Sequence, residues 1–364
     1  MPATRRRFLG RGLWGALTAS LAPQVNAGTA RVPAGNGAAG KIRVGQIGTA
    51  HAHASKLAVF RDSPDYEVVG IVEPSPELRS KATEQRAYQG LPWMTRDQLL
   101  ATPGLQLVLV ETAVRDLLDN AEACVAAGKH VHLDKPAGES LPQFQRILER
   151  AERDHLLVQL GYMYRYNPGI QLLRELLQAG WLGEIFEVHA VMSKVVDPQS
   201  RRGLAEYRGG IYFELGCHVT DLVLGVLGEP EKVTPFSRQA LAGNDTLLDN
   251  MLAVFEYPRA LATVKSSAVE VDGGARRHLV VCGTQGTLQV QPLDNPRVEL
   301  TLDRSRGKYA AGHQSIELPR YTRYVDDAAD MARVIRGEQP PLFSLAHELA
   351  VQKTVLQACA LPLT

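Results

Sequence analysis

The segment KIRVGQIGTAHAHASKL, residues 41–57, constrains the fold of this chain more than any other. It begins as a short, continuous apolar run, which is typical of a buried β-strand, and this strand ends at Gly48. Strand-like and helix-like segments then alternate as far as residue 160, and this alternation predicts a parallel, doubly wound α/β sheet. The further strands are expected at residues 66–74, 105–112, 130–136 and 156–166.

The pattern changes after Gly183, where strand-like segments follow one another through Gly, Pro and Asp turns. One helix interrupts them near residues 218–228, and two amphipathic helices close the chain. We therefore expect a second α+β domain with an open, mostly antiparallel sheet. We expect domains at residues 41–160 and 161–343, with a closing helix at 344–364 that packs back on the first domain.

The first 27 residues indicate an export signal: TRRRFLG at residues 4–10 precedes a short apolar stretch and a small residue. Its arginine pair resembles a twin-arginine signal, which predicts transport of the folded protein to the bacterial periplasm by the twin-arginine machinery. A cytoplasmic enzyme with a basic start is the alternative. The apolar stretch is too short for a comfortable membrane span, so the mature protein is not expected to be an integral membrane protein. A flexible linker is expected at residues 28–40.

Bulk composition excludes some functions. The net charge of +1 gives no indication of a nucleic-acid partner. The four cysteines are widely scattered, which argues against a disulfide framework.

The turn after the first strand departs from the usual dinucleotide pattern, in which three glycines allow a tight turn, phosphate approach and close helix packing. Gly48 keeps the first position, but Ala50 and His53 occupy the other two. Glu73 ends the second strand, 25 residues after Gly48, near the place expected for a carboxylate that binds the adenosine ribose. Glu73 favours NAD over NADP, because a carboxylate repels a 2′-phosphate.

His51 and His53 form an H-x-H pair, which ligates metals where both rings share one face of a strand. Here the pair lies at a turn that enters a helix, where alternate residues do not share a face. We expect no metal, and we expect the rings to reshape the loop and reach towards the cofactor or substrate. Surface or packing roles stay open.

Two later segments supply a set of residues suited to proton transfer. Lys135 follows a buried strand, and Glu214, His218 and Asp221 surround the start of a helix. Glu214 and His218 are four residues apart, so they share a face if this segment is helical. A cation beside a histidine lowers the pKa of its imidazole, which suits a proton acceptor near neutral pH.

With these motifs the chain resembles the glucose–fructose oxidoreductase / inositol dehydrogenase (Gfo/Idh/MocA) family. The segment AGKHVHLDKP resembles the motif A-G-K-H-V-x-x-E-K-P, with Asp134 in place of Glu. The segment GGIYFELGCH resembles G-G-x-x-x-D-x-G-x-H, with Glu214 in place of Asp, and GTQGTL resembles a further signature. The resemblance covers essentially the whole chain from Lys41, and it implies a Rossmann-type domain followed by an open-faced α/β domain.

The resemblance also implies site residues. Lys135 would hold the substrate hydroxyl, His218 would take its proton as hydride leaves for the nicotinamide, and Glu214 would orient the site. The expected NAD-binding residues are Gly48, Thr49, Ala50, His51, Glu73, Thr112, Asp134 and Lys135. The expected substrate contacts are Tyr164, Arg165, Asn167 and Asp221, with interdomain packing as the alternative for the tyrosines.

These features predict an NAD-dependent oxidoreductase that acts on a sugar, sugar derivative or cyclitol. Its cofactor would be tightly bound, and it would be a homo-oligomer joined through the open sheet. Three alternatives stay open: a glycosidase or lyase that oxidises its sugar transiently, a binding protein with a decayed site, and metal-dependent chemistry at His51 and His53. The decayed site is motivated by Ala50 and His53 in the first turn, and by the segment after the third strand. There Ala113, Val114 and Leu117 stand where the family often has Pro, Asn and His.

Overall fold

The computed structural model describes residues 40–241 and 245–364. The expected export signal and nearly all of the expected linker lie outside these ranges. Within them, no helix is both long enough and apolar enough to cross a lipid bilayer. All four cysteines fall within them, and each carries a free thiol.

The first domain contains a five-stranded sheet in which every neighbouring pair of strands is parallel, as predicted. In the spatial order β2-β1-β3-β4-β5, the strands are β1 (Ile42–Ile47), β2 (Tyr66–Val72), β3 (Leu105–Val110), β4 (His130–Leu133) and β5 (Val158–Leu160). Their near-continuous apolar sequences follow from burial on both faces. The expected fifth strand is shorter than its apolar run, because it ends at Leu160 and a turn follows at residues 163–166.

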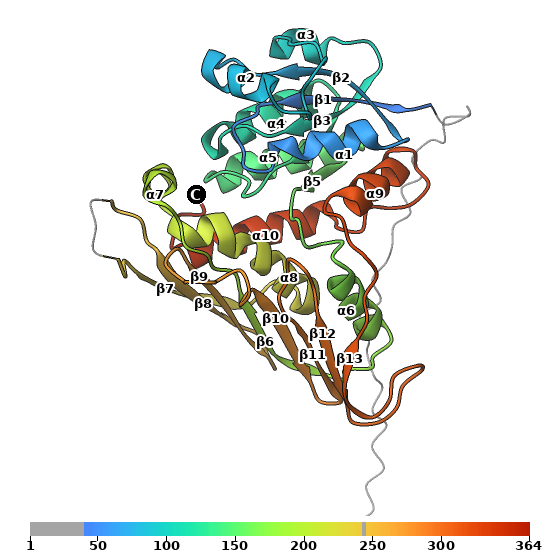
Figure 1. Ribbon diagram of the computed structural model, residues 1–364, viewed down its shortest axis with the longest axis vertical. Coiled ribbons are helices and arrows are strands. Elements are labelled where there is room, and N and C mark those ends of the chain that lie inside the picture. The colour runs from blue at the N-terminus through green and yellow to red at the C-terminus, as the bar shows by residue number, and fades with distance from the viewer. Residues whose placement is uncertain (1–39, 242–244) are drawn as a thin grey trace, which may run out of the picture. The chain divides into compact units, whose positions relative to one another are not determined.

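Helices cover both faces of this sheet (Figure 1). The helical segments are η1 (Ala54–Lys56), α1 (Leu57–Asp62), α2 (Pro76–Thr83), α3 (Arg96–Leu100), η2 (Val114–Asp116), α4 (Leu117–Ala126) and α5 (Leu141–Arg153). Helix α2 begins at the predicted cap, where the Ser75 hydroxyl accepts a hydrogen bond from the Leu78 N–H. Since α4 and α5 pack on one face and α1 on the other, the carboxyl ends of the strands are left to form a site.

The second domain contains an eight-stranded sheet, antiparallel except for the parallel pair β6 and β9, as predicted. In the order β13-β12-β11-β10-β6-β9-β8-β7, the strands are β13 (Gly312–Ile316), β12 (Val298–Leu302), β11 (Gly286–Val290), β10 (His278–Gly283), β6 (Ile185–Val191), β9 (Leu261–Ser267), β8 (Asn250–Glu256) and β7 (Lys232–Arg238). Buried and more exposed residues alternate along β8, which indicates a sheet with only one covered face.

The described helices after β5 are α6 (Pro168–Gln178), α7 (Pro198–Leu204), the π-helix η3 (Tyr212–Gly216), α8 (Cys217–Leu227), α9 (Val325–Ile335) and α10 (Leu345–Ala358). Helix α8 is the helix predicted among the strands, but α6 and α7 were not expected. The pair Asp197–Pro198 is the signal that sequence reasoning missed, because Asp197 caps α7 and Pro198 occupies its first turn.

Helix α9 differs from the expected domain division. Its residues Ala328 and Met331 join the core formed by Val44, Leu57 and other residues of the first domain. Helix α10 contacts both α5 and α8, so it joins the two halves of the described chain. The last two helices therefore hold the second domain against the first.

Candidate functional site

The turn after β1 needs its glycine. Gly48 has φ +89°, and a Cβ atom added there would lie 2.7 Å from the Cα of Thr112 at the end of β3. The next residues of the turn include Ala50 and Ala52, whose backbone N–H groups have no hydrogen-bond partner among the described residues. Such free N–H groups in a tight turn before a helix suit the phosphates of a dinucleotide.

Glu73 faces this turn from the end of β2. One carboxylate oxygen accepts hydrogen bonds from both the backbone N–H and the hydroxyl of Thr49, each at 2.8 Å. The other oxygen accepts from the Ser75 N–H at 3.0 Å. Glu73 therefore fixes the turn in addition to any contact with a ribose.

A pocket of about 790 Å³ lies at the carboxyl edge of the sheet, where β1, β2 and β3 end. Glu73 and Thr112 line it, as do Trp93 and Arg79, whose guanidinium lies 5.0 Å from the centre of the Trp93 ring. This is where an α/β sheet of this type holds the adenosine half of a dinucleotide. The free N–H groups, the glycine turn and this pocket fit such a cofactor.

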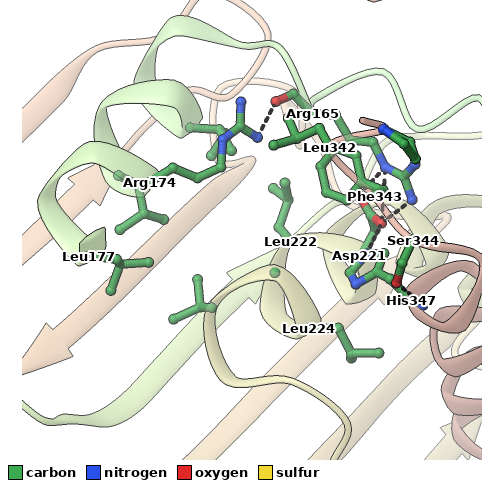
Figure 2. A pocket seen from close by; sticks show the side chains of 15 residues that line it. Arg165, Arg174, Leu177, Asp221, Leu222, Leu224, Leu342, Phe343, Ser344 and His347 are labelled. Atoms are coloured by element: carbon green, nitrogen blue, oxygen red, sulfur yellow. Dashed lines mark hydrogen bonds and ion pairs between the residues drawn. The ribbon is translucent and has the colours of Figure 1, made fainter. Parts of the chain in front are cut away.

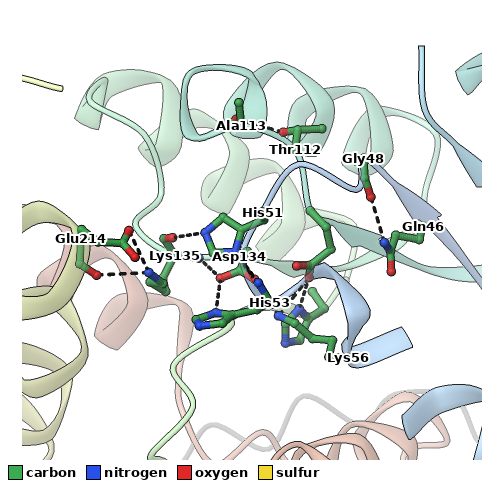
Figure 3. A network of polar contacts seen from close by, with 12 residues as sticks. Gln46, Gly48, His51, His53, Lys56, Thr112, Ala113, Asp134, Lys135 and Glu214 are labelled. Carbon is green, nitrogen blue, oxygen red and sulfur yellow. Dashed lines mark hydrogen bonds and ion pairs between the residues drawn. The ribbon is translucent and has the colours of Figure 1, made fainter. Parts of the chain in front are cut away.

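The two loop histidines point to the segment after β4 (Figure 3). His51 Nδ1 lies 3.0 Å from one Asp134 carboxylate oxygen, and His51 Nε2 lies 3.1 Å from the Lys135 carbonyl oxygen. His53 Nδ1 lies 3.4 Å from the other Asp134 oxygen. The third position of the turn thus holds a side chain that leaves the helix–strand contact and joins a polar network.

Lys56 and Glu111 extend this network below the turn, and sequence reasoning missed both. The Lys56 ammonium is fully buried, 2.7 Å from Asp134 and 3.0 Å from Glu111. Burial and the nearby Asp134 charge raise the pKa of Glu111 well above its usual value. The sequence did hold a signal for the burial of Lys56. It stands four residues before the apolar Phe60, so the two side chains share one face of a helix, and that face is buried.

Asp134 carries the negative charge of the network. Burial alone would raise the pKa of its carboxyl group, but His51, Lys56 and His53 outweigh burial and hold it well below its usual value. The ligand atoms of His51, His53 and Asp134 lie within 4.8 Å of one another, which is close enough for a metal site. The Lys56 ammonium already neutralises this carboxylate, however, so we interpret the cluster as an ion-pair network.

Lys135 and Glu214 meet between the two domains (Figure 3). The Lys135 ammonium donates to the Glu214 carboxylate at 3.2 Å and to the Glu214 carbonyl oxygen at 3.1 Å. Burial favours the neutral amine, but the charge of Glu214 outweighs this and raises the pKa of Lys135. The structure thus brings together two of the three residues expected to be catalytic, as an ion pair.

His218 is buried beside this pair and is the second residue of α8. Its ring centre lies 5.9 Å from that of Tyr162 and 6.0 Å from that of Tyr164. Burial, with a further contribution from the Lys135 charge, lowers the pKa of His218 well below its usual value. Glu214 lies in the π-helix η3 that leads into α8, and single π-turns of this kind often occur at functional sites.

The expected substrate contacts have other partners. The Arg165 guanidinium is fully buried and binds Asp221 at 2.6 Å (Figure 2). It also binds Glu348, with a closest distance of 2.6 Å. Asn167 caps α6 by accepting from the Gly169 N–H at 2.9 Å. These contacts engage Arg165, Asp221 and Asn167 internally, so we interpret them as structural.

Tyr164 stays near the site because its ring packs against His218, but its hydroxyl donates to Asp294 at 2.9 Å. Thr112 lies against the Gly48 turn, and its hydroxyl donates to the Ala113 carbonyl oxygen at 3.1 Å. Both lie beside the candidate site, with their hydroxyl hydrogens directed to the protein itself, and their expected ligand contacts stay predictions.

Comparisons with known proteins agree with this geometry. Residues 42–162 match the oxidoreductase family with an NAD-binding Rossmann fold, and residues 170–289 match the GFO/IDH/MocA C-terminal domain. The myo-inositol 2-dehydrogenase of Thermotoga maritima is 22% identical over 313 residues, which cover 84% of this chain and 90% of that protein.

Solved structures share the fold. An oxidoreductase from Agrobacterium radiobacter, in complex with NAD+, L-tartaric acid and magnesium, superposes with a TM-score of 0.76 at 17% identity, covering 88% of this chain and 97% of that one. UDP-N-acetylglucosamine 3-dehydrogenase from Acidithiobacillus ferrooxidans gives a TM-score of 0.71 at 20% identity, covering 89% and 98%. With both domains matched in sequence and in fold, the chain belongs to the GFO/IDH/MocA family of NAD-binding oxidoreductases.

Proposed function

We propose that this protein is an NAD-dependent enzyme that transfers a hydride to or from a hydroxyl-bearing carbon of a sugar, sugar derivative or cyclitol. The observation that carries the proposal is the Lys135–Glu214 ion pair beside the buried His218, next to the Gly48 turn. A buried, paired lysine next to a buried, neutral histidine is typical of a functional site. The Lys135–Glu214 pair and His218 therefore argue against a decayed site.

The chain's own residues would divide the work as follows. The Lys135 ammonium, held by Glu214, would donate a hydrogen bond to the reacting oxygen and stabilise negative charge on it. His218, kept neutral by burial, would accept the hydroxyl proton. When bound, the nicotinamide supplies the hydride acceptor.

We favour NAD over NADP because Glu73 lies at the end of β2, in the pocket that would hold the adenosine ribose. Its carboxylate would repel a 2′-phosphate. Arg79 and Arg96 line the same pocket and would partly offset that repulsion. Titration of the protein with NAD+ and with NADP+ measures the preference.

The test is a screen of cyclitols, sugars and nucleotide sugars with purified protein and NAD+, with the absorbance of reduced cofactor as the readout. We expect turnover that the substitution Lys135→Met abolishes. Cleavage of a glycoside without net reduction of NAD+ would instead indicate the transient-oxidation route. No turnover and no nucleotide binding would contradict the proposal.

Export and oligomerisation belong to the same proposal. The twin-arginine-like start at residues 4–10 supports transport after folding, with a tightly bound cofactor loaded beforehand and regenerated by a second substrate. The uncovered sheet face carries Phe236 and Leu261, which are 50% and 56% exposed. Their exposure supports a homo-oligomer joined through this face.

A further inference from the structure

The dinucleotide site does not account for His53. Its ring occupies the third position of the turn, where glycine is usual, and it points towards the second domain. The centre of the His53 ring lies 5.8 Å from that of His218 and 6.1 Å from that of Tyr324. Two imidazoles at this separation are within reach of a hydrogen bond or of one bridging water.

The described residues offer the His218 ring no direct hydrogen-bond partner to which it could pass a proton. The residue is only 1% exposed, and its Nδ1 atom has no hydrogen-bond partner among the described residues. Glu214, the carboxylate expected to orient the site, is bound to Lys135. A proton that His218 accepts must therefore pass to another group before the next turnover.

His53 has the contacts that such an acceptor needs. Its side chain is 17% exposed, so it reaches both the buried ring of His218 and the surface. On its other side, Nδ1 lies 3.4 Å from Asp134, whose carboxylate is held ionised by His51 and Lys56. A charged carboxylate behind an imidazole orients the ring and stabilises the imidazolium that forms transiently.

We propose that His53 is a positioning residue that relays the substrate's hydroxyl proton from His218 to solvent, with Asp134 stabilising the charge in transit. The inference rests on the proposed function. The steps balance with oxidised nicotinamide bound, because it would take the hydride from the substrate carbon and be reduced. The hydroxyl O–H bond breaks, and that proton passes through His218 and His53 to water.

The first test compares His53→Gly and His53→Gln with His313→Gln, a control at a histidine whose side chain is 68% exposed. Both His53 variants should lose about 100-fold in kcat, the lower end of what a positioned proton-transfer group contributes. KM and NAD+ affinity should stay close to wild type. Added imidazole should restore turnover in His53→Gly only, since that variant leaves space for the ring.

A second measurement does not depend on turnover. In the nucleotide-free His53→Gly protein, imidazole should shift the ring NMR signals of His218, and it should leave them unchanged in wild type. The relay is overturned if wild-type protein turns over and both His53 variants keep its kcat, or if imidazole neither rescues turnover nor shifts His218. A wild-type protein that binds no nucleotide overturns the proposed function, and the relay with it.

Discussion

The ammonium nitrogen of Lys135 lies 3.2 Å from a carboxylate oxygen of Glu214, although 79 residues separate the two along the chain. The contact joins the segment after β4 of the first domain to the π-helix that precedes α8 of the second. A site built in this way is complete only when the two domains pack together, and both partners are buried enough for the charge pair to be strong.

Removal of the Lys135 ammonium should abolish catalysis. We expect Lys135→Met to lower kcat/KM by about 1,000-fold or more, within the range of a group that acts on the reacting oxygen. Steady-state kinetics on the best substrate of the screen gives the value. Lys353→Met is the matched control, since Lys353 forms a partly exposed pair with Glu229, and it should keep wild-type kinetics. Equal activity of the two variants would remove Lys135 from the mechanism.

Glu214→Asp should also reduce turnover, although it restores the residue usual in the family motif. The shorter side chain withdraws the carboxylate by about 1.5 Å, and misplacement by about 1 Å can cost 100-fold in rate. We expect kcat to fall by at least about 10-fold, with KM little changed, in the same assay. An increase in kcat would show that the Lys135–Glu214 contact is not the productive one.

Arg165 should be a determinant of stability. Its guanidinium is fully buried between Asp221 and Glu348, so Arg165→Leu leaves two carboxylates without their partner. Breaking a buried pair in this way costs about 3–5 kcal/mol, which denaturant unfolding can measure. As the control, Arg259→Leu breaks an exposed pair with Glu184 and should cost at most about 1 kcal/mol. Similar losses for the two variants would contradict the structural role given to Arg165.

Stability should fall on acidification below about pH 6.5, the ordinary pKa of histidine. Five histidines have lowered pKa values, chiefly through burial: His53 and His130, each to about 4, and His132, His218 and His278. At a pH between the lowered and the ordinary pKa of such a histidine, the unfolded chain binds more protons than the folded protein. Each histidine therefore lowers the free energy of unfolding by up to about 1.4 kcal/mol for each pH unit of acidification. Raised carboxyl pKa values, such as about 7 for Asp327, act in the opposite direction.

His130 isolates one of these contributions, because it lies outside the polar network and its Nδ1 atom accepts from the Leu157 N–H at 2.9 Å. Denaturant unfolding of His130→Asn between pH 5 and pH 6.5 should show a slope that is shallower by about 1 kcal/mol per pH unit. An unchanged slope would mean that His130 titrates normally in the folded protein.

The fold could be predicted because its signals are local. Apolar strands, helix caps and glycine turns follow one another in the order of a doubly wound sheet, and each is readable within ten residues. Lys135, Glu214 and His218 were also readable, as types of residue suited to one reaction.

Partners distant in the chain could not be predicted. The guanidinium of Arg165 is a chemical group suited to bind a polar substrate. In the fold, however, it is enclosed by Asp221 and by Glu348, which lies 183 residues away in the chain. Lys56 and Glu111 look like surface charges until the fold buries them together. A sequence states which groups are charged, whereas tertiary packing decides which of those charges neutralise one another.

The most direct test of the central claim is calorimetric titration of nucleotide-free protein with NAD+ and NADH, for wild type and for Gly48→Ala. The account predicts saturable binding of both nucleotides at one site per chain. Binding should be strongly weakened in Gly48→Ala, because the added Cβ would lie 2.7 Å from Thr112 at a positive φ. A folded wild-type protein that binds neither nucleotide, or a Gly48→Ala protein that binds as tightly as wild type, would contradict it.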